Sequence, residues 1–547
     1  MRTGEAAFGS WVISAATRSL QPTPLRRAWP ILAAWLTFAI ASAPACAQDR
    51  ADEIAELKTR IERLERSMPA EGVVPAAATD AKPLEKIDSN PTMEAKWKNA
   101  LQFESKDKAF RWAVGGVIQF DQSFFGANDA VVRSLGTFNN LVDPGLALQD
   151  SFAFRRARLR FSGLMWEQVE FFAQYEFAQS LDLRRRTLGI SPAATSVGSM
   201  NDFDPGDNVG FNEVYLGVTK LPVLGTLRVG RHRESLNFVT ATADNNQVWL
   251  ERGLMFDAFN GDFNFSNGVT VSNTVLDERA YFLFGFFHAN NNSNRGFYAV
   301  GDGEYAYDIR LTGLPVYDED TKTWVHVGAD YSYRNPHASQ VRYRARPNVR
   351  SGPGFLTPNV LSTGTIFTND AQQIVNLEFA MAKGRFTFAA EASGSWVTNA
   401  VTGGPPRSDG TLPAGAVNRG TYTAAGGYVE ALCFLTDDHR KYVKDRPGYA
   451  RVVPKKVFRF ANGSAGRIVS CGGWEVGLRY EYLDLTDRGI NGGAGNAASA
   501  CVNWYLNSNA RIQANYVWQD RRFAPTNTAG LVNGSLHAFG LRFNADF

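Results

Sequence analysis

Apolar and polar residues alternate along the chain from residue 111 to the C-terminus, with the period of two that a β-strand requires. In the first such segment Trp112, Ile118 and Phe120 fall on one face, whereas Gln119 and Asp121 fall on the other. We therefore expect β-strands with one apolar and one polar face. The same alternation recurs in 154–161, 171–177, 305–312, 325–334, 474–482, 511–519 and 539–547.

The segment 154–161 carries an unusual concentration of positive charge. Arg156, Arg158 and Arg160 share one face of this strand, about 7 Å apart from one to the next, and Ala157 and Leu159 lie on the other. An ordinary strand with a solvated basic face is one interpretation. The neighbouring strands favour another, because their polar faces carry more charges than the core of a soluble sandwich tolerates. A closed membrane barrel has lipid outside and water inside, and it accommodates both faces.

The connections and the aromatic residues support this interpretation. Aromatic residues crowd the apolar faces near strand ends, as in an interfacial girdle. Short connections such as 163–167 and 383–384 alternate with long polar ones such as 183–208, 335–368 and 402–420, an arrangement typical of bacterial outer-membrane barrels. Residues 111–547, at roughly 27 residues per strand and connection, allow about 16 strands. The predicted fold class is all-β, a transmembrane antiparallel β-barrel.

The N-terminal part of the chain is organised differently. An apolar stretch follows Arg26 and Arg27 and ends in Ala-Cys-Ala, so residues 1–47 are predicted to be a cleaved signal peptide. A lipoprotein acylated at Cys46 is the weaker alternative. Residues 48–68 place apolar residues at coiled-coil spacing, a pattern that also fits a lone amphipathic helix. Residues 69–110 are predicted to be a linker and lead-in to the barrel at 111–547.

Net charge gives no global preference for anions or cations. The chain has 57 basic and 54 acidic residues, and residues 1–47 hold four of the former and one of the latter. The remaining chain therefore has equal numbers of each, and any ion preference depends on where the charges are placed. Beyond residue 47 the chain has three cysteines, an odd number that implies no disulfide framework. A single Cys433–Cys471 disulfide is an alternative if the protein resides in an oxidising compartment.

Several short motifs follow one another along residues 110–547. They are Arg155-Arg156-Ala157-Arg158-Leu159, Val229-Gly230-Arg231, Leu250-Glu251-Arg252-Gly253, the segment 434–442, Gly473-Trp474-Glu475 and Asn503-Trp504-Tyr505. In this order the sequence resembles the phosphate-selective porins O and P of Gram-negative outer membranes. The resemblance implies a homotrimer of 16-stranded barrels in the cell outer membrane, each with a loop folded inward. It also implies an arginine ladder that leads anions to a narrow binding zone.

Six arginines are the candidate anion-binding residues. Arginine stays charged at any relevant pH, and its planar fork bonds phosphate oxygens bidentately. The first candidates are Arg156, Arg158 and Arg160; the second are Arg231, Arg233 and Arg252, which flank the expected inward loop 235–249. For the second group a structural role is an equally strong alternative to anion binding: each arginine would then pair with a carboxylate in the lumen or contact lipopolysaccharide at the rim. The alternating arginines at 342, 344 and 346 are expected to form a vestibule or surface patch.

The predicted function is an anion-selective diffusion channel, for phosphate or polyphosphate. A broad-specificity porin for small hydrophilic solutes is the main alternative, because acids such as Glu170, Glu176 and Glu475 also face the lumen. An adhesive barrel is a further one. The chain lacks the GxSxG, HExxH and P-loop spacings, and His439 beside Asp437 and Asp438 is typical of a turn. We expect no enzyme activity, no cofactor, no metal and no nucleic-acid partner; the expected partners are small anions, outer-membrane lipid and lipopolysaccharide.

Overall fold

The computed structural model describes residues 92–139, 144–178, 210–289, 301–350, 357–407, 409–460, 468–524 and 531–547. The predicted signal peptide, the predicted coiled coil and residues 69–91 of the predicted linker lie outside the described residues. No helix among the described residues is long and apolar enough to cross a membrane.

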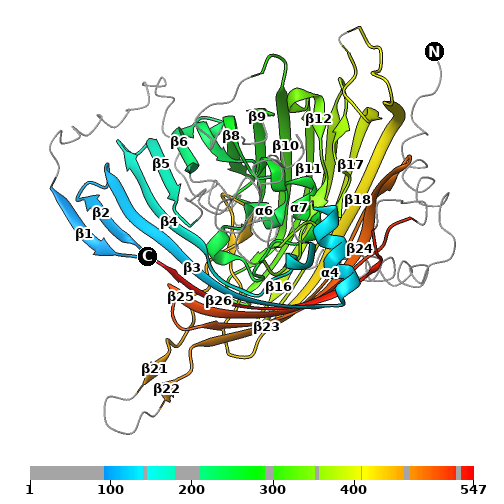
Figure 1. Ribbon diagram of the computed structural model, residues 1–547. Coiled ribbons are helices and arrows are strands. Elements are labelled where there is room, and N and C mark those ends of the chain that lie inside the picture. Colours follow the sequence, from blue (N-terminus) through cyan, green and yellow to red (C-terminus); the bar gives the residue numbers. More distant parts are fainter. Residues whose placement is uncertain are drawn as a thin grey trace, which may run out of the picture. The chain divides into compact units, whose positions relative to one another are not determined.

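Sixteen antiparallel strands close into one ring (Figure 1). Each strand pairs with the next along the chain, and the last pairs with the first, so the barrel and the strand number expected from the sequence are confirmed. The strands are β3 (Arg111–Ala127), β4 (Ser151–Met165), β5 (Val169–Glu176), β6 (Gly210–Leu221), β7 (Gly225–Arg233), β8 (Phe265–Val275), β9 (Ala280–His288), β10 (Tyr305–Asp318), β11 (Thr323–Arg334), β16 (Gln372–Lys383), β17 (Phe386–Thr402), β18 (Val417–Phe434), β23 (Gly473–Asp487), β24 (Ile490–Tyr505), β25 (Ala510–Arg521) and β26 (Gly534–Asp546).

The ring closes at a seam where β3 has two partners along the same edge. Its first residues pair with β2 (Leu101–Ser105), and Val117 onward pairs with β26. Where the partners meet, Gly116 N donates to the carbonyl of Phe547 at 2.6 Å. A Cβ at Gly116 would lie 2.7 Å from the Phe547 ring, so this approach requires glycine. Within the predicted lead-in, β1 (Met93–Trp97) and β2 form a hairpin that continues the wall beyond the closed ring.

The two faces of the wall differ as the alternation predicts. Phe154 on β4 and Leu478 on β23 are 55% and 67% exposed on the outer surface. Gln119 and Arg542, on the inner faces of β3 and β26, are buried. An apolar exterior around a polar, charged interior is the arrangement that a lipid bilayer selects, because lipid cannot solvate charge.

Connections at one end of the barrel are short, and most at the other end are long. Two break this rule: 488–489 is a tight turn at the long-loop end, and 435–472 is a long segment at the short-turn end. The short ones are 166–168, 222–224, 276–279, 319–322, 384–385 and 506–509; the long ones are 128–150, 177–209, 234–264, 289–304, 335–371, 403–416 and 522–533.

Three of the long connections fill the interior. The inward loop, residues 234–264, contains α6 (Phe238–Ala241), η5 (Asp244–Asn246), α7 (Leu254–Phe259) and η6 (Gly261–Phe263), and Figure 1 shows α6 and α7 within the ring. Connection 335–371 contains η7 (His337–Ser339), β12 (Gln340–Val341), β13 (Arg344–Ala345), β14 (Leu361–Ser362) and β15 (Ile366–Phe367). Connection 435–472 contains β19 (Tyr442–Val443), β20 (Gly448–Tyr449), β21 (Arg459–Phe460) and β22 (Ile468–Ser470); β21 and β22 project from the short-turn end (Figure 1). Connection 128–150 carries α4 (Asp129–Phe138) and η3 (Pro144–Leu146).

These segments give the barrel a packed apolar core that the strand alternation does not reveal. Phe238, Trp249 and Phe259 of the inward loop are almost fully buried, and they cluster with Tyr343 and Tyr449 from the other two connections. The lumen is therefore narrowed from both ends by loops that pack on one another.

Candidate functional site: an arginine cluster on the inward loop

A β-bulge on β4 sets the positions of the arginines. Gln119 of β3 pairs with Arg156, but the next residue, Phe120, pairs with Phe154. Arg155 is the extra residue of the bulge, and it reaches Glu251 of the inward loop with hydrogen bonds of 2.8 and 3.1 Å. Strict alternation would have placed Arg155 toward lipid; the bulge turns both Arg155 and Arg156 toward the lumen.

Four of the six predicted arginines converge on a single carboxylate, that of Asp244 in η5. Arg158 and Arg252 form ion pairs with its two oxygens. Arg233 Nη2 lies 3.1 Å from Oδ1, and Arg156 Nε lies 3.4 Å from Oδ2. We call these five residues the Asp244 cluster; it joins strands β4 and β7 to the middle of the inward loop, at Asp244 and Arg252.

The arginines of the cluster also hold the backbone of the loop. Arg233 Nη1 donates to the carbonyl of Thr240 at 2.9 Å, and Arg252 Nε donates to that of Val239 at 3.2 Å. The loop in turn caps its own short helix, since the Asn237 side chain accepts from Thr240 N at 2.8 Å. Arg156 Nη1 donates to Gln119 on the wall at 2.6 Å. The cluster therefore fixes the loop position as well as the local charge.

Positive charge is in excess in the Asp244 cluster. Apart from Asp244, the only carboxylate among the described residues that forms an ion pair with these arginines is Glu176, 2.6 Å from Arg158 Nε. Four guanidiniums thus face two carboxylates. Burial opposes ionisation of Asp244, but the attraction of the four arginines outweighs it and holds the pKa of this carboxyl well below its ordinary value. The cluster stays net positive.

A second group next to the cluster is balanced in charge. Glu251 binds Arg155 and also lies 3.4 Å from Arg350 and from Arg542. Arg350 pairs further with Asp257, and Arg542 with Asp121. This group ties connection 335–371 to the inward loop and to the seam strands, and it adds no net charge.

The segment after β18 enters the lumen from the short-turn end. Arg440 and Glu475 form a fully buried pair at 2.6 Å. Arg310 of β10 donates to the carbonyl of Pro447 at 2.9 Å, and Tyr449 N donates to the Thr242 hydroxyl of the inward loop at 3.0 Å. The lumen is thus constricted where this segment meets the inward loop.

The remaining predicted arginines lie apart from the Asp244 cluster. Arg160 lies against Gly115 nearer the short-turn end, where Arg451 and Asp546 are its main electrostatic neighbours. Arg231 is buried on β7, with Glu213 and Glu234 as the acids that act on it most. Arg156, Arg158 and Arg160 face the lumen as expected, but Arg156 and Arg158 are engaged with carboxylates rather than presented to water.

One expectation about the long loops is wrong. Arg344 and Arg346 were expected in a vestibule or surface patch, yet both are only 8% exposed. Connection 335–371 folds inward here: Arg346 N donates to Asp257 of α7 at 3.0 Å, and Asn348 bonds Glu481 of β23. Alternation in a loop says nothing about which way the loop folds, so the pattern could not reveal this. Cys433, Cys471 and Cys501 are free thiols.

Sequence reasoning missed Asp244, Glu251 and Arg155. Asp244 was detectable, because it is the one acid in the segment 235–249 between Arg233 and Arg252. The bulge at Arg155 was not, because it depends on the register of two strands.

The ring of strands, with its apolar exterior and charged, constricted lumen, defines a membrane-spanning barrel channel. The family model of the phosphate-selective porins O and P matches residues 137–547. This match covers most of the chain, which therefore belongs to that family and is an outer-membrane porin.

Individual relatives are distant. An uncharacterised protein of Caulobacter vibrioides is 28% identical over 90% of this chain and 89% of its own length. Porin O of Pseudomonas aeruginosa is 22% identical over 77% of this chain and 86% of its own. Among solved structures, the outer-membrane channel DcaP of Acinetobacter baumannii is 11% identical, with a TM-score of 0.45 over 81% of this chain and 99% of its own.

Proposed function

We propose that this porin is an anion-selective diffusion channel whose preferred solutes are phosphate-like oxyanions. The observation that carries the proposal is the excess of guanidinium groups around Asp244, on the loop that narrows the lumen. In a confined lumen with low-dielectric walls, such an excess attracts anions and repels cations even when the whole chain is nearly neutral.

The types of contact in the cluster suit transit rather than capture. Guanidinium groups bind phosphate oxygens through charge-assisted, bidentate hydrogen bonds. Here each arginine already shares Asp244 or a backbone carbonyl, so an arriving anion competes for donors that are partly occupied. Binding is then weak enough for the ion to leave, as conduction requires. Arg160 and Arg231 extend the positive lining beyond the cluster.

The expected assembly completes the proposal. We expect a homotrimer, exported through cleavage of residues 1–47 and supported by the heptad pattern at 48–68. The lipid-facing wall then contacts outer-membrane lipid, and the long-loop rim contacts lipopolysaccharide.

A broad-specificity porin is the second candidate, and the balanced ion pairs around Glu251 favour it. Planar-bilayer recordings in a salt gradient separate the two. Anion selectivity, with block of chloride current by inorganic phosphate, supports the proposal. An anion-to-cation permeability ratio near one with no phosphate block supports the broad porin, and cation preference refutes the anion channel.

The cluster itself is tested with Arg156→Gln and Arg158→Gln. Each removes one positive charge from the lumen, and we expect lower anion selectivity and weaker phosphate block. Arg407→Gln, in the exposed connection 403–416, removes the same charge outside the lumen and is the matched control. An equal effect of all three variants would contradict a local role of the cluster.

A further inference from the structure

The hairpin of β21 and β22, which projects from the short-turn end (Figure 1), exposes apolar side chains. Phe460 of β21 and Ile468 of β22 pair directly across the hairpin, and they are 59% and 51% exposed. The next residue along β22, Val469, is 67% exposed. Exposed apolar side chains concentrated in so short a hairpin mark a surface that contacts a membrane or another molecule.

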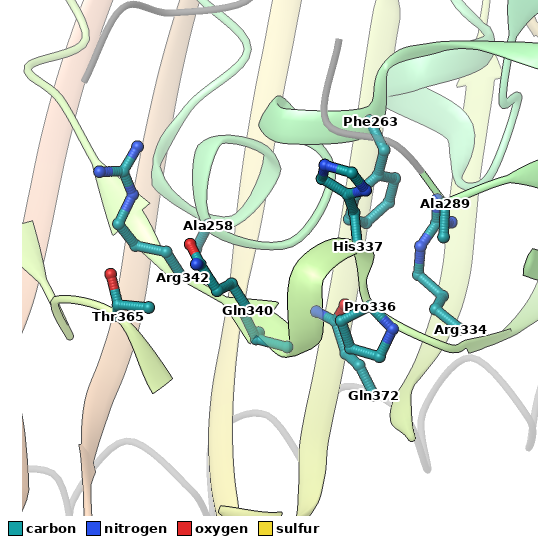
Figure 2. A pocket seen from close by; sticks show the side chains of 11 residues that line it. Ala258, Phe263, Ala289, Arg334, Pro336, His337, Gln340, Arg342, Thr365 and Gln372 are labelled. Carbon is teal, nitrogen blue, oxygen red and sulfur yellow. The ribbon is translucent and has the colours of Figure 1, made fainter. Parts of the chain in front are cut away.

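An aromatic residue at the long-loop end is covered by the chain itself. Figure 2 shows Phe263 of η6 near Arg334, whose guanidinium lies 3.8 Å from the centre of the ring. Phe263 also packs against the buried apolar core. More than half of the Phe460 side chain, in contrast, is left uncovered.

Aromatic rings connect the hairpin to the lipid-facing wall. Trp474 of β23 stacks on Trp504 of β24, with 5.0 Å between ring centres. Strand alternation places Trp474 on the same outer face as Leu478. The ring of Phe458 lies 5.0 Å from that of Trp504, and the ring of Phe460 lies 4.9 Å from that of Phe458. The apolar surface of the hairpin therefore continues that of the barrel wall.

The two tryptophans indicate the depth at which the hairpin meets the bilayer. Trp474 and Trp504 both donate their indole N–H to the carbonyl of Cys471, at 3.1 and 2.7 Å. A tryptophan with an apolar body and a satisfied polar tip is typical of the boundary between hydrocarbon and headgroups. The headgroup layer beyond this boundary is roughly 5–7 Å thick, comparable with each ring-to-ring step from Trp504 to Phe460. Short turns of outer-membrane barrels face the periplasm, so the hairpin begins in the headgroup layer of the periplasmic leaflet.

Positive charge accompanies this apolar surface. From residue 446 to residue 470 the sequence contains six basic residues and no acidic one. Lys456 and Arg459 are exposed. Arg459 alternates with Phe458 and Phe460, so it lies on the opposite face of its strand. An apolar face accompanied by basic residues is the pattern of an element that lies in the membrane interface and pairs with anionic headgroups.

From these observations we propose that the β21–β22 hairpin binds anionic phospholipid in the periplasmic leaflet of the outer membrane. Phe460, Ile468 and Val469 enter the boundary between headgroups and acyl chains, and Lys456 and Arg459 pair with headgroup phosphates. An anionic polysaccharide such as peptidoglycan would pair with the basic residues but leave the apolar side chains in water. The inference goes beyond the proposed function, since a porin of either selectivity could carry this hairpin.

A spin label at Val469→Cys tests where the hairpin lies. Cys433 and Cys501 are replaced by alanine and Cys471 by serine, and the full chain is reconstituted into vesicles of phosphatidylethanolamine mixed with phosphatidylglycerol. Oxygen concentrates in lipid, whereas a nickel chelate stays in water. We expect the label at residue 469 to be more accessible to oxygen than to nickel. The control label, Asp320→Cys in an exposed turn at the same end of the barrel, should show the reverse.

Substitutions in the hairpin separate its apolar and charged contributions. Phe460→Ser lies outside the closed ring, so the barrel should fold while the label at residue 469 becomes accessible to nickel. Lys456→Gln and Arg459→Gln should each weaken binding of phosphatidylglycerol about fivefold, measured by native mass spectrometry, the loss of one basic contact with an anionic headgroup. Arg407→Gln, in the exposed connection 403–416, should leave it unchanged.

Three results would overturn the inference. In the first, the label at residue 469 is as accessible to nickel as the label at residue 320; cosedimentation with purified peptidoglycan that Lys456→Gln abolishes would then assign the hairpin to that polymer. In the second, spin–spin broadening at residue 469 disappears on dilution with unlabelled protein, which would show that a second copy of the chain covers the hairpin. In the third, Lys456→Gln and Arg459→Gln bind phosphatidylglycerol as tightly as the wild type.

Discussion

Replacing Asp244 with asparagine tests how the inward loop is held. The amide keeps the shape of the side chain but removes the charge that Arg156, Arg158, Arg233 and Arg252 share. Removing one partner of a buried ion pair costs roughly 3–5 kcal/mol, because the other charge stays buried without compensation.

Retained partners place Asp244→Asn at the lower end of this range. Arg158 keeps Glu176 at 2.6 Å, and Arg233 and Arg252 keep backbone carbonyls at 2.9 and 3.2 Å. We expect the substitution to destabilise the docked position of the loop by about 3 kcal/mol, which shifts the equilibrium between docked and undocked loop roughly a hundredfold toward the undocked state. Since the wall does not depend on this contact, the barrel should stay folded while the loop loosens.

Single-channel recording measures this loosening directly. We expect larger and noisier conductance in Asp244→Asn than in wild type. An oxyanion can take the place of the missing carboxylate among the arginines. Phosphate should therefore reduce the current noise of the variant and raise its unfolding temperature. Phosphate at a hundred times its dissociation constant would return about 2.7 kcal/mol.

Asp320→Asn, in the exposed turn between β10 and β11, is the control for the chemical change. Wild-type conductance and noise in Asp244→Asn would refute the idea that the cluster holds the loop. Equal stabilisation of wild type and Asp244→Asn by phosphate would refute the idea that the four guanidiniums form an oxyanion site.

Three further predictions test other parts of the molecule. Glu475→Gln should lower the free energy of unfolding by roughly 3 kcal/mol or more, because Arg440 is fully buried against Glu475. It should also increase conductance, because it frees the segment 435–472 at the short-turn end; conductance equal to wild type would contradict this. Leu159→Arg places a charge toward lipid at a cost of roughly 2–4 kcal/mol near the midplane and should impair insertion, measured by heat-modifiability, whereas Leu159→Ile should insert normally. The pKa of Asp244 is lowered, so the stabilisation of the docked loop by this carboxylate is fully present above the ordinary carboxyl pKa. It is lost only as the pH falls through the lowered pKa. The current noise in single-channel records should therefore be the same at pH 7 and at about pH 5.

The barrel could be predicted from the sequence alone. The alternation of period two, the rhythm of short and long connections and the length of the segment from residue 111 onward predicted about 16 strands with lumen and lipid faces assigned. These are local properties, since each side chain of a strand points opposite to its neighbours whatever the rest of the chain does. The arginines of β4 and the segment between Arg233 and Arg252 were likewise located from sequence.

The contacts of those arginines, in contrast, depend on how distant segments of the chain pack in three dimensions. Asp244 lies 86 residues from Arg158 along the chain, and no spacing rule links the two. The bulge that turns Arg155 inward depends on the register between β3 and β4, and the inward course of residues 344–350 and 440–449 depends on buried pairs with distant strands. Strand alternation comes from local backbone geometry, whereas the position of a loop inside a barrel depends on which buried charges find partners across it.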